Sequence, residues 1–253
     1  MTKQKILIAT GGTGGHIFPA CSLANYLIIK NFNVQITTDK RGAKYLEAQN
    51  FNLKQLPSSP LKKDNIINLL LSISIVSFAI IKSFIFLTFN RPSIIFGMGG
   101  YSSFPVCIAA TVLRIPFIIY ESNLLIGKAN KFLLPYAKKI FVSHRELEGV
   151  QKKFEKKVSE VGNIIRKEVF EFQTKKVNFN QNDSLNILVL GGSQAAEIFG
   201  EKLPSIFKLH QESDFKIKIF QQCLPNQNSH LKAFYEKNNI DYEIFNFSND
   251  IIK

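Results

Sequence analysis

The chain has 253 residues, of which 45% are hydrophobic, and its formal net charge is +13. The hydrophobic fraction supports a packed core and excludes an intrinsically disordered chain. The three cysteines are far apart and form no CxxC pair, which excludes a disulfide framework and a zinc site. The N-terminus runs from a polar start directly into a short apolar strand and has no signal-peptide pattern, so we expect a cytoplasmic protein.

The positive charge has two interpretations. Scattered lysines on a solvated surface account for it without any partner. Alternatively, the charge attracts an anionic partner such as lipid head groups or phosphates. The longest basic clusters are pairs such as Lys62-Lys63, and no DNA- or RNA-binding signature accompanies them. We therefore expect no nucleic-acid partner.

Short apolar runs alternate with helical patterns along the first part of the chain. In chain order, the pattern predicts strand Lys5–Thr10, helix His16–Lys30, strands Asn33–Thr38 and Ile94–Phe96, helix Tyr101–Leu113, and strands Pro116–Tyr120, Lys139–Ser143 and Lys157–Val161. Strands and helices that alternate at this spacing predict an α/β fold, in which parallel sheets carry helices on both faces.

The segment Ile66–Phe89 approaches the length of a transmembrane helix, but Lys82 and four serines interrupt it. We expect a pair of helices that lies between two strands of the first sheet, largely within the core. The two alternatives are a peripheral surface that contacts a membrane and a true membrane span. Flanking basic residues, as in an interfacial anchor, keep the peripheral alternative open: Lys62, Lys63, Lys82 and Arg91.

The strand–glycine–helix pattern occurs twice, as KILIATGGTGG and again as NILVLGGSQAA. Two such openings predict two Rossmann-like domains, which we place at residues 1–163 and 164–253. The second series predicts strand Leu185–Leu190, helix Gln194–His210, strand Lys216–Phe220, helix Asn228–Asn238 and strand Tyr242–Phe247. So short a series predicts an incomplete second domain and a truncated chain.

Gly11, Gly12, Thr13, Gly14 and Gly15 join the first strand to the first helix, where their amides admit a phosphate or a sugar. His16 follows them, and a neutral histidine there is either a general base for a sugar hydroxyl or a residue that only hydrogen-bonds the loop. Asp39 ends the second strand, where a dehydrogenase binds ribose, but Ile17 replaces the third glycine of GxGxxG. A dehydrogenase is therefore disfavoured.

Further polar or glycine-rich turns follow other predicted strands. Gly99, Gly100 and Tyr101 belong to a second glycine turn, and two such turns at neighbouring strand ends suit a diphosphate. Glu121 is either a base, an acceptor for a sugar hydroxyl, or a structural loop residue. Arg166, at the domain junction, either binds a phosphate or makes a surface ion pair. Ser193 caps the first helix of the second domain, touches a donor phosphate, or does both.

The ordered motifs GGTGGHIFPA, GMGGYSSFP, YESN, GNIIR and LGGSQAA resemble those of the MurG family of peptidoglycan glycosyltransferases. This resemblance implies a GT-B fold and transfer of N-acetylglucosamine from UDP-N-acetylglucosamine to a lipid-linked muramoyl-pentapeptide. It also implies a peripheral position on the cytoplasmic face of an anionic membrane, with acceptor and membrane on the N-terminal domain and the nucleotide sugar mainly on the C-terminal domain. Neither a cofactor nor a metal is implied, and no DxD-like motif stands in a suitable loop.

The resemblance also assigns site residues. Donor contacts fall on Thr13, Gly14, Gly15, Asn123, Arg166 and Ser193, and acceptor activation falls on His16 and Glu121. The sequence departs from the family at Tyr120 and Ser122, where HEQN is usual, and at Ile164 and Ala195, where proline and glycine are usual. The family's uridine-contacting helix has no counterpart up to Lys253, so inactivity of this chain is a further expectation.

Three competing functions remain at this point. One is a GT-B enzyme for another lipid-linked acceptor, which the choice of acceptor would distinguish. Another is a truncated, non-catalytic protein that binds a membrane or a lipid diphosphate. The third, the dehydrogenase, predicts binding of NADH.

Overall fold

The computed structural model describes residues 3–46, 50–60, 65–171, 185–192, 195–209, 216–246 and 248. The chain divides into two compact units, Met1–Phe170 and Glu171–Lys253. Ser193 and the Lys62-Lys63 pair lie outside the described residues.

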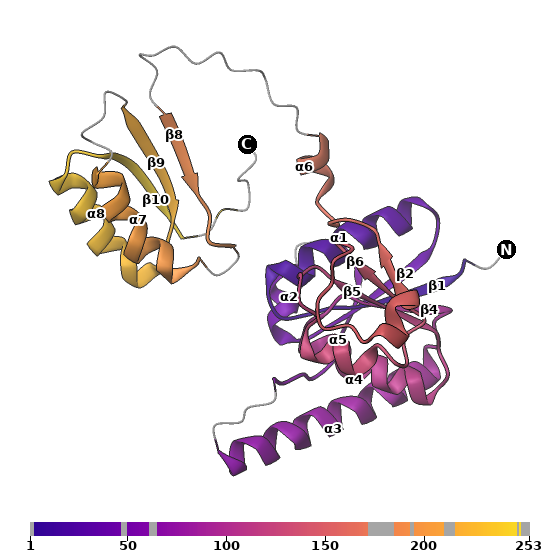
Figure 1. The fold of residues 1–253 in the computed structure, drawn as a ribbon. Coiled ribbons are helices and arrows are strands. Elements are labelled where there is room, and N and C mark those ends of the chain that lie inside the picture. The colour runs from indigo at the N-terminus through magenta and orange to yellow at the C-terminus, as the bar shows by residue number, and fades with distance from the viewer. Residues whose placement is uncertain are drawn as a thin grey trace. The chain divides into compact units, whose positions relative to one another are not determined.

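The first unit is built on a parallel sheet of seven strands in the order β3-β2-β1-β4-β5-β6-β7 (Figure 1). Its strands are β1 (Lys5–Ala9), β2 (Asn33–Thr38), β3 (Asn52–Gln55), β4 (Ile94–Gly97), β5 (Phe117–Glu121), β6 (Lys139–Val142) and β7 (Val158–Glu160). Its helices are α1 (Gly14–Ile29), α2 (Lys40–Leu46), α3 (Ile66–Phe89), α4 (Gly100–Val112), α5 (Lys128–Leu133) and α6 (Lys167–Glu171), with the 3-10 helix η1 (Lys152–Lys157).

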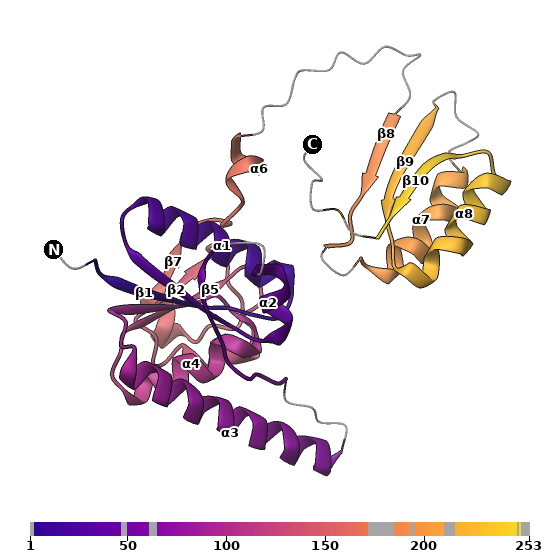
Figure 2. The same cartoon turned by 180° about the vertical axis from the view of Figure 1, so that it is seen from behind.

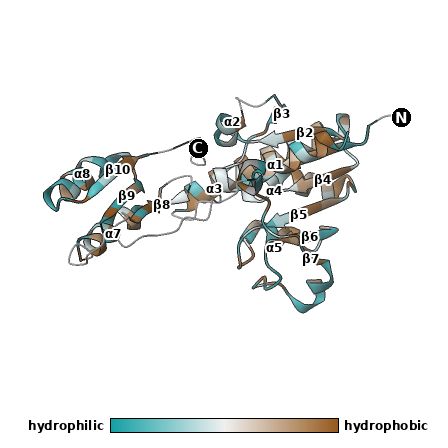
Figure 3. Cartoon of the chain, turned by 90° about the horizontal axis from the view of Figure 1, so that it is seen from above, coloured by the Kyte–Doolittle hydropathy of each residue, from teal (hydrophilic) through white to brown (hydrophobic). Residues whose placement is uncertain are grey.

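Helices cover both faces of this sheet, as Figures 1 and 2 show: α1 and α2 on one face, and α3, α4 and α5 on the other. Hydrophobic residues run along β4 and β5, which Figure 3 draws in brown. All five residues of β5 are buried, as expected for a central parallel strand covered on both faces. One hydrophobic core includes Ile17 and Ile36 on the first face, and another includes Val106 and Ile119 on the second.

Our prediction that Ile66–Phe89 forms a pair of buried helices is wrong. The segment is a single helix, α3, which begins at the N-cap Asn65, whose side chain accepts a hydrogen bond from the Asn68 amide at 2.7 Å. No glycine or proline interrupts the segment. Ser74 does not break the helix because its hydroxyl donates to the Leu70 carbonyl within it at 2.9 Å.

Most of the α3 surface is exposed, although its residues are apolar. Its long side chains include Ile67 at 65% exposure and Ile81 at 57%, while Ala79 and Leu87 are among the few buried residues. Of the 18-residue stretch of α3 that has membrane-spanning hydropathy, only 22% is buried. By length and composition, α3 is the one described helix that could cross a membrane. A helix of this kind does not fill the core of the first unit.

The second unit contains a smaller parallel sheet of three described strands in the order β10-β9-β8. Its elements are β8 (Leu185–Val189), α7 (Glu197–Leu209), β9 (Ile217–Gln222), the 3-10 helix η4 (Pro225–Gln227), α8 (Asn228–Lys237) and β10 (Asp241–Phe245). Both α7 and α8 lie on the same face of this sheet (Figure 2). Phe207 and Tyr235 from these helices pack with Ile219 of β9 in a separate core.

The first unit extends to Phe170, beyond the boundary that we expected at residue 163. Tyr120 near the end of β5 ties the start of this junction segment to the first unit, because its hydroxyl accepts a hydrogen bond from the Ile164 amide at 3.2 Å and donates to the Gly162 carbonyl at 3.3 Å. The junction segment is thereby fixed to the first unit.

Candidate active site

The order of strands in the larger sheet identifies its ligand crevice. The chain leaves β1 through α1 toward β2 on one side, and it leaves β4 through α4 toward β5 on the other. Strands β1 and β4 are parallel neighbours, with Ala9 opposite Gly97. In open parallel sheets, ligands bind at such a switch point, beyond the carboxyl ends of the strands. Both glycine turns predicted from the sequence lie there.

The β1–α1 turn presents main-chain groups at the start of α1. Gly12 has a φ of +85°, which favours glycine, and Thr13 is the N-cap, with extended backbone. The helix then begins at Gly14, which is buried, and continues through the exposed Gly15. The first amides of a helix have no partner within it and carry partial positive charge, so this turn suits an anion.

The β4–α4 turn lies directly against His16. A Cβ atom at Gly99 would stand 2.9 Å from His16 Cε1, and one at Gly100 would stand 3.0 Å from the Gly11 carbonyl oxygen. Both glycines have positive φ, at +89° and +75°. Glycine is therefore required twice over here, by backbone conformation and by contact. Tyr101, in the first turn of α4, is 51% exposed beside this contact.

The Glu121 carboxylate accepts its hydrogen bonds from residues of the β5–α5 loop and the start of α5. Its Oε1 accepts from the Asn123 side-chain amide at 2.7 Å and the Asn123 backbone at 3.2 Å. Its Oε2 accepts from the Gly127 amide at 2.9 Å and from Asn130 Nδ2 at 3.0 Å. The side chain is 3% exposed. Four donors on a buried carboxylate fix the β5–α5 loop and the direction of Asn123.

Arg166 is placed beside α1. Its guanidinium carbon lies 5.4 Å from the centre of the Phe18 ring, two residues after His16 in the sequence. Such a cation–π contact orients the guanidinium while leaving its donors available for a ligand. The Tyr120 hydroxyl positions Arg166 further, because it binds both Gly162 and Ile164 just before it.

In a dehydrogenase the acidic residue at this place binds a ribose hydroxyl, whereas the carboxylate of Asp39 accepts hydrogen bonds from within the protein. Its Oδ1 accepts from the Gly12 amide at 3.2 Å and the Gly42 amide at 2.8 Å, and its Oδ2 accepts from Ser58 at 2.9 Å. Burial raises the pKa of this carboxyl, but hydrogen bonds from Gly42, Gly12, Ser58 and Ser102 outweigh burial, and the net pKa is lowered. Asp39 thus holds the first glycine turn in place through its hydrogen bond from the Gly12 amide.

In the second unit, the β8–α7 turn also requires glycine. A Cβ atom at Gly191 would stand 2.0 Å from the Ala196 amide nitrogen, and Gly192 has a φ of +77°. The Gly191 amide donates to Gln222 Oε1 at 3.1 Å, which ties the turn to β9. Ser193, predicted to contact the donor, lies outside the described residues.

The structure brings together the residues predicted around β1 and β4, namely His16, Gly99 and Gly100, and it orders Glu121 with Asn123 in the adjoining loop. Sequence reasoning did not identify Arg41, Ser58 or Ser102 at the first glycine turn. The polar residues that follow β2 and β3 were the available signal. No group of three potential metal-ligating side chains occurs within the described part of the chain.

Two Rossmann-like units with glycine turns at their strand ends are the components of the GT-B fold, and the family models identify the chain as a glycosyltransferase of this class. The glycosyltransferase family 28 N-terminal domain matches residues 6–142, and the C-terminal domain of the same family matches residues 186–253.

Comparison with individual relatives shows to which family of glycosyltransferases the chain belongs. The UDP-N-acetylglucosamine--N-acetylmuramyl-(pentapeptide) pyrophosphoryl-undecaprenol N-acetylglucosamine transferase of Pelagibacter ubique is 35% identical over 99% of this chain and 68% of the relative. The enzyme of the same name from Rickettsia felis is 34% identical over 96% of this chain and 69% of the relative. The crystal structure of MurG from Acinetobacter baumannii superimposes with a TM-score of 0.70 at 25% identity, covering 99% of this chain and 70% of that one. The chain belongs to the MurG family within glycosyltransferase family 28.

A putative UDP-N-acetylglucosamine 2-epimerase from Listeria monocytogenes shares the fold, with a TM-score of 0.64 at 13% identity over 98% of this chain and 70% of that one.

Proposed function

We propose that the protein transfers N-acetylglucosamine from UDP-N-acetylglucosamine to the undecaprenyl-diphosphoryl-muramoyl-pentapeptide, which is the reaction named for its relatives. The observation that carries this proposal is the contact of His16 with Gly99 and Gly100 at the β1–β4 switch point. A proton acceptor and two glycine turns suited to phosphate then share one site.

In this reaction the C4 hydroxyl of the muramoyl sugar attacks the anomeric carbon of N-acetylglucosamine. A new C–O bond forms, the bond to the diphosphate breaks, UDP leaves with the electron pair, and the configuration inverts. His16 takes the hydroxyl proton. Glycine-turn amides and the helix starts stabilise the diphosphate charge, because fixed dipoles there need no reorganisation during the reaction.

His16 is the better base of the two candidates. Glu121 already accepts four hydrogen bonds within its loop, and all four would be disturbed if it moved or took up a proton. We assign Glu121 the role of a positioning residue for Asn123.

The other site residues bind the two substrates. Thr13, Gly14, Gly15, Asn123, Arg166 and Ser193 contact the donor, and Gly99, Gly100 and Tyr101 contact the acceptor diphosphate. The exposed Tyr101 side chain and the oriented guanidinium of Arg166 support two of these roles. The first unit, for which the sequence predicted the bounds 1–163, takes the acceptor and the membrane, and the second unit takes most of the nucleotide sugar.

We further propose that α3 docks the protein on the cytoplasmic face of the cell membrane. Its exposed apolar side chains offer the hydrophobic surface that an interfacial helix needs, and Lys82 lies exposed among them, with its Nζ 4.7 Å from the centre of the Phe78 ring. A lysine near the headgroups attracts anionic lipid and adds about 1 kcal/mol to binding.

A transfer assay tests the proposed reaction. The purified protein is incubated with radiolabelled UDP-N-acetylglucosamine and the undecaprenyl-linked muramoyl-pentapeptide, and in parallel with UDP-glucose or with a different polyprenyl-linked sugar. We expect label in the lipid product only with the first pair. Equal transfer to another lipid-linked sugar would instead support a GT-B enzyme for that acceptor. Label in neither lipid product would contradict the proposed transfer and agree with the alternative expectation of an inactive chain.

Vesicle flotation tests the membrane role separately. The wild-type protein should float with vesicles that contain anionic phospholipid, and Ile81→Glu should weaken flotation. Lys82→Glu should reduce binding to anionic vesicles, whereas the same change of charge at the exposed Lys237 of α8 should not. Undiminished flotation of both α3 variants would contradict docking through this helix.

A further inference from the structure

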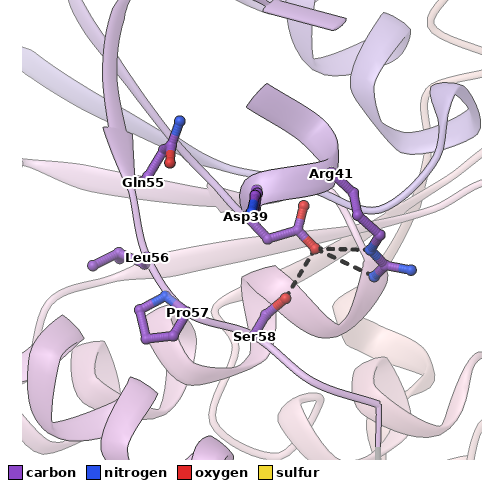
Figure 4. Close-up of a pocket in the computed structure, with 7 residues that line it drawn as sticks. Asp39, Arg41, Gln55, Leu56, Pro57 and Ser58 are labelled. Carbon is purple, nitrogen blue, oxygen red and sulfur yellow. Dashed lines mark hydrogen bonds and ion pairs between the residues drawn. The ribbon is translucent and has the colours of Figure 1, made fainter. Parts of the chain in front are cut away.

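A pocket of about 420 Å³ opens beside the first glycine turn, between the ends of β2 and β3 (Figure 4). Its walls come from two short stretches of the chain: Asp39, Lys40, Arg41, Gln55, Leu56, Pro57 and Ser58. Two cations and one carboxylate line it, so its net charge is positive. The family assignment gives no role to any of these residues.

Asp39 holds the side chain of Arg41, which lines this pocket. Asp39 Oδ2 accepts from Arg41 Nη2 at 3.2 Å and from Nε at 3.4 Å. The Asp39 side chain is 6% exposed, while that of Arg41 is 57% exposed. Figure 4 shows the remaining guanidinium nitrogen pointing away from Asp39. The buried carboxylate therefore orients one edge of the guanidinium and leaves its outer edge for a ligand.

The same carboxylate connects the pocket to the glycine turn. Asp39 Oδ1 accepts from the Gly12 amide at 3.2 Å, and Arg41 Nη2 lies 3.9 Å from the position that a Cβ atom at Gly12 would occupy. Ser58, which donates to Asp39, accepts a hydrogen bond from the Ser102 hydroxyl of α4 at 3.1 Å. Contacts from both sides of the switch point thus fix Asp39, and Asp39 in turn holds Arg41 next to a turn that suits anions.

We propose that this pocket is an anion subsite for the acceptor, in which Arg41 binds a phosphate or carboxylate oxygen and Asp39 is the positioning residue. The inference rests on the proposed transfer reaction and deepens it. The acceptor offers anionic oxygens in its diphosphate and in the carboxylates of its peptide. Guanidinium groups bind both through paired N–H donors.

Kinetics of Arg41→Ala test the subsite. Loss of a charge-assisted contact should raise the KM for the acceptor about 10- to 100-fold and leave the KM for UDP-N-acetylglucosamine near its wild-type value. Lys44→Ala is the matched control, because Lys44 is an exposed cation on the same helix outside the pocket. An unchanged acceptor KM in Arg41→Ala, or an equal rise in Lys44→Ala, would overturn the proposal.

Two acceptor analogues identify the source of the anion. If Arg41 binds the diphosphate, the penalty of Arg41→Ala persists with an acceptor that lacks the peptide. If Arg41 binds a peptide carboxylate, the penalty disappears with that acceptor. Asp39→Asn should also raise the acceptor KM, and it should add little in the Arg41→Ala background, because both changes remove the same contact.

Calorimetry with inorganic pyrophosphate separates this proposal from the transfer reaction. Wild-type protein and Lys44→Ala should bind pyrophosphate alike, and Arg41→Ala should bind it about tenfold more weakly. If that difference appears but wild-type protein transfers no sugar, the subsite stands and the proposed reaction fails. If transfer is normal and Arg41→Ala changes neither pyrophosphate affinity nor acceptor KM, the subsite fails alone.

Discussion

The His16 imidazole lies against the backbone of Gly99, where a Cβ atom would stand only 2.9 Å from its Cε1 and Nδ1 atoms. The two residues come from turns that are far apart in the sequence, and they meet because β1 and β4 are parallel neighbours. A proton acceptor is thereby placed between two starts of helices.

Replacing His16 with alanine removes the proposed base. We expect kcat to fall about 10²- to 10⁴-fold, the range typical of general-base catalysis, while the affinity for UDP-N-acetylglucosamine stays near wild type. Steady-state kinetics and calorimetric donor titration measure the two quantities. Unchanged turnover would remove His16 from the mechanism.

Glu121→Gln separates a positioning role from a catalytic one. The amide that replaces one carboxylate oxygen cannot accept the hydrogen bonds from both Gly127 and Asn130, so unfolding free energy should fall by about 1–3 kcal/mol. Residual transfer should keep the pH dependence of the wild type. Loss of activity with unchanged stability and a lost ionisation in the pH–rate profile would instead identify Glu121 as the base.

Tyr120→Phe tests the anchor of the junction segment. Without its hydroxyl, the Ile164 amide and the Gly162 carbonyl lose a partner, and the cost should be about 1–3 kcal/mol of unfolding free energy. Urea denaturation measures this cost. Tyr136→Phe is the control, because Tyr136 is 55% exposed and its loss of a hydroxyl should change little. Equal stability of Tyr120→Phe and wild type would contradict the anchor.

Ala195 has a φ of +48°, a left-handed conformation that is strained for a residue with a Cβ atom. Ala195→Gly relieves this strain and should stabilise the second unit by about 1 kcal/mol. Ala196→Gly, one residue later and without positive φ, should destabilise it slightly, because glycine increases the entropy of the unfolded chain. The thermal midpoints of the two variants should therefore move in opposite directions, and a fall in both would refute the assignment of strain.

Asp39 predicts a pH dependence of stability. The pKa of its carboxyl is lower in the folded protein than its ordinary value of about 3.9, so the ionised form favours folding. This contribution is complete above pH 4 and is lost as the pH falls through the folded-state pKa. The difference in unfolding free energy between wild type and Asp39→Asn should therefore shrink below about pH 4. A difference that stays constant down to pH 2 would contradict this linkage.

The sequence predicted the sheet of the first unit well where apolar runs end in glycine or in polar residues. The bounds of β2 match the predicted Asn33–Thr38. The short, polar segments Lys40–Leu46 and Asn52–Gln55 escaped prediction, because they carry little apolar periodicity. For α3, a helix apolar on most sides gives no periodicity that distinguishes a buried position from a lipid-facing one.

Some features of the site could likewise be predicted from the sequence, and others could not. The meeting of His16 with Gly99 could be predicted, because the carboxyl ends of neighbouring parallel strands share one edge of the sheet. The saturation of Glu121 could not, since it depends on where Gly127 and Asn130 lie in three dimensions. The same holds for the contacts that Ser58 and Ser102 make around Asp39, from segments far apart in the sequence.

The proposed reaction requires the turns after β1 and β4 to form one ligand site. Amide chemical shifts of isotope-labelled protein, recorded during titration with UDP-N-acetylglucosamine and then with the lipid-linked acceptor, would show whether both turns bind these ligands. We expect saturable shifts in both turns, at the amides of residues 12–16 and 99–101. Saturable binding that leaves both turns unperturbed and moves only distant amides would contradict it.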